Sequence, residues 1–387
     1  MPKVGLGRAG TLLLVLGVAS GCGKSSGSTA DDSVATGGVA GVGAGSSGAA
    51  GSHVGAGTSA GGSAAGSAPE AEPCPVPLSD WEPVQGDVFE GLGNTVATHD
   101  YVLASSDAGS LLFPISAEAP EAMTAPITID ANIGSPQAAW QGDGALFVLG
   151  TLATGALLAR VESSGHATTV DIPGGLQAAG RSAVAQAGKR VAVAGGDGAG
   201  TFLVHLFDDE LGPIKSFSLP KHSFGSLTAD AQGLRLAVID STTKALELYR
   251  FTDAELTLER SEPLPGLPLP FTVAWVGDSV VVEINGKLVL VDSTGSQTSL
   301  EPPSKDGTNY VYSLSTSSGV LGNVLGATVS NAPFVGRLQG GSLEWAGPGE
   351  QCVFADVRAD TQSLGVYYLA TLRNRTLAYF GFKCPAP

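Results

Sequence analysis

The chain is short of basic residues. It has 20 Lys and Arg against 36 Asp and Glu in 387 residues, which gives a formal net charge of −16 at pH 7. An acidic surface repels phosphate backbones, so the composition excludes nucleic acid as a partner. It also disfavours direct docking of the folded domain on anionic lipid. The plainer consequence of such a surface is solubility.

The chain also lacks the compact motifs of metal and nucleophilic chemistry. Its five His residues are scattered, with no H-x-x-x-H or H-E-x-x-H spacing, and it has no G-x-S-x-G sequence. Those spacings place two imidazoles on one helix face, or a serine on a sharp turn between a strand and a helix. The sequence therefore predicts no catalytic residue, no metal site and no cofactor.

Cysteine is scarce as well. The four residues Cys22, Cys74, Cys352 and Cys384 fit no zinc-binding spacing. In an exported protein a disulfide is expected instead, because the compartment is oxidising.

What the sequence does contain is a repeat. A short apolar run returns every 45 residues, and the last step is 41 residues. The runs begin at Tyr101, Leu146, Val191, Leu236, Val281, Gly326 and Tyr367. A period in the forties is typical of β-propellers, in which each repeat folds into one four-stranded blade. Residues 74–387 are therefore predicted to form an all-β, seven-bladed β-propeller.

Each repeat reads as four strands separated by Gly and Asp turns. The apolar run is the second strand, which neighbouring blades cover on both faces. The expected inner strands are 94–99, 137–142, 181–186, 225–230, 271–276, 310–315 and 353–358. Outer strands, such as 214–219 and 256–261, are the most polar because they lie at the rim.

The last repeat lacks an outer strand, since only five residues follow Phe382. Residues 74–90 precede the first inner strand and are expected to supply it, through the segment that begins at Trp81. This closure of the ring brings Cys74 near Cys384, so these two are predicted to form a disulfide. Cys352 is then left as a free thiol.

The N-terminal 21 residues are expected to be a signal peptide. Lys3 and Arg8 precede an apolar stretch from Ala9 to Gly21, which is too short to span a bilayer as a helix. The junction before Cys22 consists of small residues and resembles the bacterial lipobox. The resemblance implies that Cys22 carries a lipid anchor, and by the proteobacterial sorting rule the next residue, which is not Asp, favours the outer membrane.

Residues 22–73 are predicted to be a disordered tether. They are mostly Gly, Ala, Ser and Thr and have almost no large side chain to bury. A flexible coil of this length has a root-mean-square span of roughly 40 Å. Such a tether would hold the folded domain away from the membrane.

The segment Leu288–Gly295 carries a further resemblance. It reads Leu-Val-Leu-Val-Asp-Ser-Thr-Gly, a strand that ends in Asp before a Thr-Gly turn, and Leu158–Gly165 repeats it more loosely. In this the repeats are similar to the quinoprotein-like and YVTN-type propeller repeats. A lipid-anchored propeller of this size also resembles, in architecture, the scaffold lipoprotein of the outer-membrane β-barrel assembly machine.

The expected ligand face is the one built by the outer-to-inner loops and the second-to-third loops of the blades. Its candidate binding residues are Asp197, Lys221, His222, Asp306, Tyr310 and Arg373, with Asp107 and Asp240 on the same loops. Charged and aromatic side chains together suit a polar ligand or a protein partner.

The sequence thus predicts a lipoprotein of the bacterial cell envelope whose propeller is a binding or scaffold module. Its partners would be the membrane, through the lipid anchor, and envelope proteins or a polar ligand. Two alternatives stay open. One is a propeller enzyme, a lactonase or a quinoprotein-like dehydrogenase, with its site at the central channel. The other is a component of surface adhesion.

Overall fold

The computed structural model describes residues 74, 76–98, 100–115, 124–142, 144–178, 183–252, 255–264, 272–284, 287–303, 311–319, 322–329, 332–339, 341–347, 355–360, 365–372 and 376–385. Residues 1–73, with Cys22, lie outside this part of the chain. So do Cys352 and three of the predicted ligand residues, Asp306, Tyr310 and Arg373.

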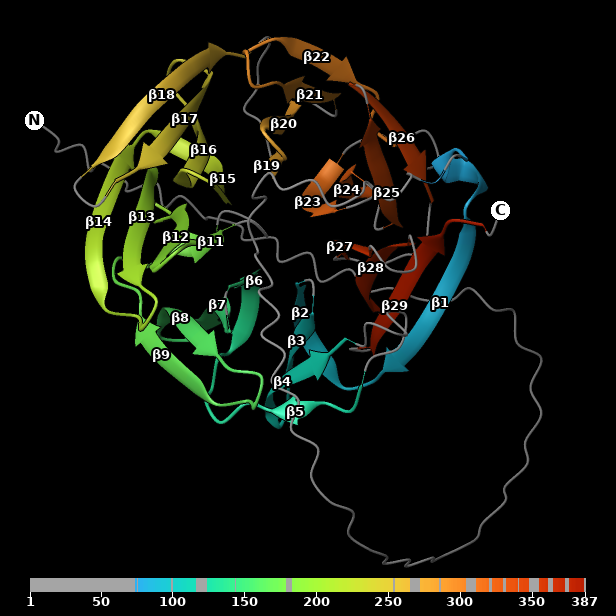
Figure 1. Cartoon of the computed structure of the whole chain (residues 1–387). Helices are drawn as coiled ribbons and strands as arrows, with labels where there is room; N and C mark the ends of the chain where they lie inside the picture. Colours follow the sequence, from blue (N-terminus) through green and yellow to red (C-terminus); the bar gives the residue numbers. More distant parts are fainter. Residues whose placement is uncertain are drawn as a thin grey trace, which may run out of the picture.

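The described residues form antiparallel sheets arranged in a ring (Figure 1). The strands nearest the centre are β2 (Leu92–Ala97), β6 (Ser135–Gln141), β10 (Gln177–Ala178) with β11 (Val184–Ala187), β15 (His222–Asp230), β19 (Thr272–Val276), β23 (Val311–Gly319) and β27 (Ala355–Asp360). The second strands are β3 (Tyr101–Ser106), β7 (Leu146–Leu152), β12 (Arg190–Gly196), β16 (Gly233–Asp240), β20 (Ser279–Ile284), β24 (Gly322–Val329) and β28 (Gly365–Leu372).

The third strands are β4 (Gly109–Pro114), β8 (Gly155–Val161), β13 (Thr201–Asp208), β17 (Ala245–Phe251), β21 (Lys287–Val291), β25 (Ala332–Gln339) and β29 (Thr376–Lys383). The outer strands are β5 (Ile127–Thr128), β9 (Ala167–Asp171), β14 (Pro213–Pro220), β18 (Leu256–Pro263), β22 (Gln297–Leu300), β26 (Ser342–Ala346) and β1 (Glu82–Phe89). The helical content of the described residues is one 3-10 turn, η1 (Leu78–Asp80). No helix among them is both long and apolar enough to cross a membrane.

The core lies between neighbouring sheets. Consecutive residues of a second strand are buried, as at Phe147 and Val148 of β7, so both faces of that strand are covered. Phe147 packs with Val191 of the next sheet, while Val148 packs with Leu103 of the preceding one. This two-sided burial explains why the second strands are continuous apolar runs. The outer strands lack it, and β14 has only exposed and half-buried residues.

Three of the inner strands begin earlier than the sequence predicted. The predicted starts at Asn94, Gln137 and Gly225 are wrong, because β2, β6 and β15 start at Leu92, Ser135 and His222. The reason is a shift of register near the start of each of these strands, between Leu92 and Thr95, Pro136 and Ala138, and Ser223 and Gly225. An inserted residue breaks the alternation of apolar and polar positions on which the prediction depended.

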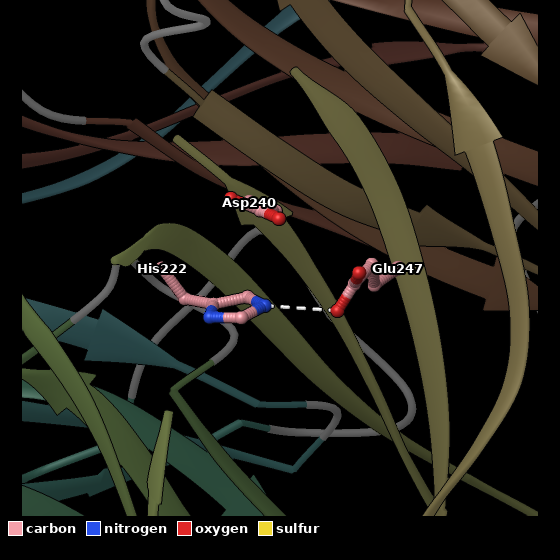
Figure 2. A group of neighbouring side chains, drawn as sticks. All are labelled: His222, Asp240 and Glu247. Carbon is pink, nitrogen blue, oxygen red and sulfur yellow. Dashed lines mark hydrogen bonds and ion pairs between the residues drawn. The ribbon is translucent and has the colours of Figure 1, made fainter. Parts of the chain in front are cut away.

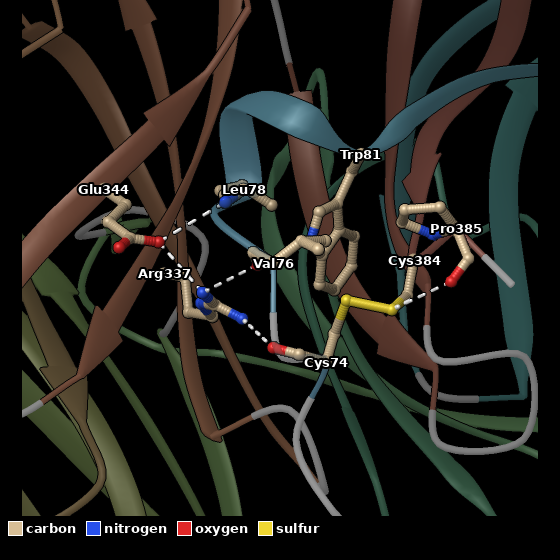
Figure 3. The surroundings of a disulfide bond; sticks show 8 residues. All are labelled: Cys74, Val76, Leu78, Trp81, Arg337, Glu344, Cys384 and Pro385. Carbon is tan, nitrogen blue, oxygen red and sulfur yellow. Dashed lines mark hydrogen bonds and ion pairs between the residues drawn. A yellow bond between two sulfur atoms is a disulfide. The ribbon is translucent and has the colours of Figure 1, made fainter. Parts of the chain in front are cut away.

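The two ends of the folded chain meet in one sheet. β1 pairs antiparallel with β29, with Glu82 opposite Lys383, so the strand order of this sheet is β1-β29-β28-β27. Cys74 and Cys384 lie 5.9 Å apart between Cα atoms, and their sulfur atoms are bonded (Figure 3). The outer strand of the last sheet therefore comes from the beginning of the folded segment.

An arginine of the neighbouring sheet holds the segment that leads into β1. Arg337 of β25 is buried, and its guanidinium donates to the carbonyls of Cys74 and Val76, each at 3.4 Å (Figure 3). It also donates to Glu344 of β26 at 2.9 Å and lies 5.7 Å from the centre of the Trp81 ring. This contact ties the closing strand to the adjacent sheet as well as to its own.

We expect Cys74→Ser and Cys384→Ser to lower the free energy of unfolding by the same amount. Each removes one cross-link over 310 residues, which adds at most about 5 kcal/mol in the chain-entropy model. The double variant should lose no more than either single one, because all three changes remove one bond. Urea denaturation with and without reductant measures these differences. A non-reducing peptide map that joins Cys352 to Cys384 would contradict the pairing.

Candidate functional site

Three loops lie together at one end of two neighbouring sheets. They connect β12 to β13, β14 to β15, and β16 to β17. The Lys221 amide donates to the Gly200 carbonyl at 3.0 Å, and the Ser241 amide donates to the Lys221 carbonyl at 2.8 Å. The Leu264 amide then donates to the Lys244 carbonyl at 3.0 Å. These backbone hydrogen bonds join the loops to one another and to the segment that follows β18, and the three loops together are called the loop face below.

Left-handed backbone is concentrated at the loop face. Among the described residues other than glycine, four have positive φ, and three of them are Lys221 (66°), Phe224 (51°) and Lys244 (60°). Non-glycine residues adopt this region at a cost, which the surrounding structure has to offset. Lys221 and Phe224 flank His222 on either side, so the position of His222 is set by two unusual backbone turns.

Asp197 shapes its own turn. Its carboxylate accepts hydrogen bonds from the amides of Ala199 at 2.7 Å and Thr201 at 3.0 Å. The bond from Thr201, followed by the one from Ala199, holds the pKa of this carboxyl below its usual value. Asp197 therefore acts first as a turn residue on the loop face, although its carboxylate lies at the surface.

His222 meets two carboxylates that come from the other strands of its sheet. It is the first residue of β15 and pairs directly with Asp240, the last residue of β16. Glu247 lies on β17 opposite Val238, two residues before Asp240, so all three side chains project from the same face of the sheet. His222 Nε2 is 2.8 Å from Glu247 Oε2, and the nearest ligand atoms of the three residues lie within 4.8 Å of one another (Figure 2).

The surroundings of this cluster orient each group. Thr242 N and Thr243 Oγ1 donate to Asp240 at 2.6 and 2.8 Å. Burial works to raise the pKa of Asp240, but these hydrogen bonds outweigh it and hold the pKa below its usual value. The Tyr249 hydroxyl donates to Glu247 Oε2, and burial, followed by this bond, raises the pKa of Tyr249. Both carboxylates are thus held in place by neutral donors.

Of the predicted ligand residues that the structure describes, Lys221 is exposed and His222 is half-buried. The side chain of His222 lies beside two carboxylates. The sequence placed one of them, Asp240, on the same face as His222, whereas the other, Glu247, was not predicted. Glu247 sits inside β17, the third strand of its sheet, where a single Glu in the sequence looks like an ordinary solvent-facing residue. Only the register of β16 against β17 reveals it.

The opposite end of the same sheet holds a different polar network. Arg250 donates to both carboxylate oxygens of Asp230, at 2.9 and 3.0 Å, and to Glu259 at 2.6 Å. Arg235 adds weaker contacts to the same two acids and lies 4.4 Å from the centre of the Trp275 ring. Two acids and two arginines balance in charge, which is the pattern of a structural network.

A pocket of about 350 Å³ opens beside that network, between turns of three successive sheets. Three of its polar side chains already have partners of their own. Gln141 bonds to Asp100, Gln186 donates to the Gly188 carbonyl, and Asp230 is held by Arg250. The loop face is therefore the better candidate for a site.

Comparison with protein-family models and with curated protein sequences finds no match. Solved structures do match. A catalytically inactive virginiamycin B lyase from Staphylococcus aureus with quinupristin has a TM-score of 0.57 at 11% identity, covering 78% of this chain and 99% of that one. The WD40 domain of coronin from Toxoplasma gondii has a TM-score of 0.56 at 12% identity, covering 81% and 89%. The chain is a β-propeller.

A chain of the mitotic checkpoint complex is similar too, with a TM-score of 0.53 at 12% identity and coverage of 79% and 95%. At such identities the likeness establishes the propeller fold alone. One of these proteins is named as an enzyme and another belongs to a protein assembly, so the fold alone assigns no activity to this propeller.

We expect His205, a buried histidine of β13, to make the propeller sensitive to mild acid. Burial lowers the pKa of His205, which is 5% exposed. The unfolded chain therefore takes up a proton at a higher pH than the folded one, and the free energy of unfolding falls as the pH drops below about 6.5. Urea denaturation at pH 7 and pH 5 should show a smaller loss for His205→Gln than for the unchanged protein. An equal loss would contradict this assignment.

Proposed function

We propose that the protein is a lipoprotein of the bacterial cell envelope and that its propeller binds an envelope protein or a polar ligand through the loop face. The observation that supports the binding role most strongly is the set of backbone hydrogen bonds that joins the loops of that face. Three loops from two sheets are locked by backbone hydrogen bonds, and they present Lys221, His222 and Asp197 at fixed positions. A preorganised polar surface loses little entropy when a partner binds.

The envelope location rests on the N-terminal sequence. A basic start, a short apolar stretch and a small-residue junction at Cys22 together resemble a lipoprotein signal. The Gly- and Ser-rich segment up to residue 73 would allow the propeller to reach a partner some distance from the bilayer. Several acyl chains on Cys22 would give stable anchoring, and the acidic propeller would not compete for the anionic lipid surface.

The fold is compatible with this role. By its name, the mitotic checkpoint complex is a protein assembly, and one of its chains is similar in structure to this propeller. In this chain, the loop face combines two lysines, the exposed Lys221 and the half-buried Lys244, with acidic groups on an otherwise acidic surface. Positive charge within a mostly negative surface favours a partner that carries both negative and positive groups. Pairing with both kinds of charge orients the partner as well as binding it.

We expect Cys22→Ala to release the protein from the membrane. Without the thiol of Cys22 no lipid can be attached at this position. Membrane fractionation of cells that express the full chain, followed by immunoblotting, measures the distribution. Membrane attachment that the substitution leaves unchanged would contradict the lipid anchor.

We expect Lys221→Glu to abolish capture of the partner while Lys189→Glu leaves it intact. Both substitutions replace an exposed lysine with glutamate and so change the charge equally. Lys189, however, lies in the β11–β12 turn at the opposite end of the strands. The full, lipidated chain is purified from membranes under mild detergent, and the co-purified proteins are quantified against the unchanged protein. A partner set that both variants lose, or both keep, would contradict binding through the loop face.

A further inference from the structure

The repeat allows one sheet of the propeller to be compared with its neighbours at matching positions. In the β6–β9 sheet the positions of His222, Asp240 and Glu247 correspond to Pro136, Gly150 and Ala159. In the sheet that contains β10 and β12 they correspond to Ala178, Gly195 and His205.

At those two glycines the backbone packs tightly. A Cβ on Gly150 would lie 2.1 Å from the Ile133 carbonyl oxygen, and one on Gly195 would lie 2.0 Å from that of Gln177. The β15–β18 sheet instead accommodates a carboxylate at this position and places a histidine across from it. In this sheet three side chains able to ligate a metal, His222, Asp240 and Glu247, therefore stand where the neighbouring sheets have a close contact between backbones.

The hydrogen bonds of His222 leave room for a cation. Its Nδ1 lies 3.0 Å from the Pro220 carbonyl oxygen, which can only accept, so Nδ1 carries a hydrogen. A neutral imidazole then has its lone pair on Nε2, directed at the Glu247 carboxylate 2.8 Å away. Two acceptors face each other there, so either a second proton on the imidazole or a metal ion lies between them. Histidines that ligate metals characteristically donate their other ring nitrogen to a carbonyl in this way.

The charges around the cluster point the same way. In the described part of the chain, no lysine or arginine forms an ion pair with Asp240 or Glu247. The side chains of His222 and Glu247 are only 11% and 14% exposed, so water screens them poorly. At the other end of the sheet the acids have two arginines. Two half-buried carboxylates with a single imidazole leave excess negative charge that a divalent ion would neutralise.

We infer that His222, Asp240 and Glu247 bind a divalent transition-metal ion of the zinc type. One imidazole and two carboxylates form a mixed nitrogen and oxygen set, which favours Zn²⁺ over the all-oxygen preference of Ca²⁺ and Mg²⁺. Ligand atoms around tetrahedral zinc lie about 3.3 Å apart. The pair His222 and Glu247 would therefore open by a few tenths of an ångström, and Asp240 would move inward.

Three protein ligands leave a fourth position for water or for a group supplied from outside. Tyr249, through its bond to Glu247, and Thr243, through its bond to Asp240, become the outer partners that orient the ligands. The ion would sit at the loop face, between two sheets. This inference goes beyond the proposed partner binding and needs no partner for its test.

The test is a Zn²⁺ titration of the purified full chain by isothermal calorimetry, with metal content checked after dialysis. We expect one equivalent to bind and to raise the melting temperature of the unchanged protein. His222→Ala and Glu247→Gln should each weaken binding at least tenfold and remove the thermal shift. Tyr249→Phe should weaken binding by about tenfold, since it removes an outer partner and keeps the ligands.

Two control variants should bind as the unchanged protein does. His166→Ala removes the exposed pair in which His166 lies 2.7 Å from Asp130 with no third ligand, and Cys352→Ser removes a thiol. Circular dichroism establishes whether each variant is folded. If His222→Ala does not fold, Glu247→Gln decides the test, because it keeps the size of the side chain. The inference would be overturned if Zn²⁺ did not bind one to one, or if His222→Ala and Glu247→Gln bound Zn²⁺ as tightly as the unchanged protein does. Binding of Ca²⁺ as tight as that of Zn²⁺ would also overturn it.

Discussion

The fold depends on covering both faces of every sheet. A second strand such as β7 buries consecutive residues, Phe147 toward one neighbour and Val148 toward the other, so no sheet is stable without two others beside it. A row of such sheets leaves no apolar sheet face exposed only when it closes into a ring. Here β1 supplies the outer strand of the sheet that β27, β28 and β29 begin, and both ends of the folded chain are held at the same place.

The loop face follows from the same arrangement. Where the core between two sheets ends, the strand termini and their connecting loops have to satisfy one another. The backbone bonds among Gly200, Lys221 and Ser241 do this, and they fix His222 at the start of β15. The register of that sheet then sets His222 beside Asp240 and Glu247. The chemistry of the cluster is thus a product of strand pairing and not of any local sequence motif.

The sequence was sufficient to predict the all-β propeller fold, because the period of 45 residues and the apolar second strands follow directly from two-sided burial. It was insufficient for the inner strands, whose starts depend on bulges such as the one after Ser223. That error left His222 in a loop and hid its pairing with Asp240. Glu247 and Arg337 were beyond sequence reasoning, since their partners lie on other strands and, for Arg337, more than 260 residues away.

The central claim is that β1 is an integral strand of the last sheet. Hydrogen exchange of the exported protein, resolved by peptide, tests it most directly. Because β1 pairs with β29 from Glu82 to Phe89, its amides should exchange as slowly as those of the outer strands β14 and β18, and β1 and β29 should lose protection together when the protein is destabilised. Rapid exchange across 82–89 while the other outer strands stay protected would contradict the closure of the ring.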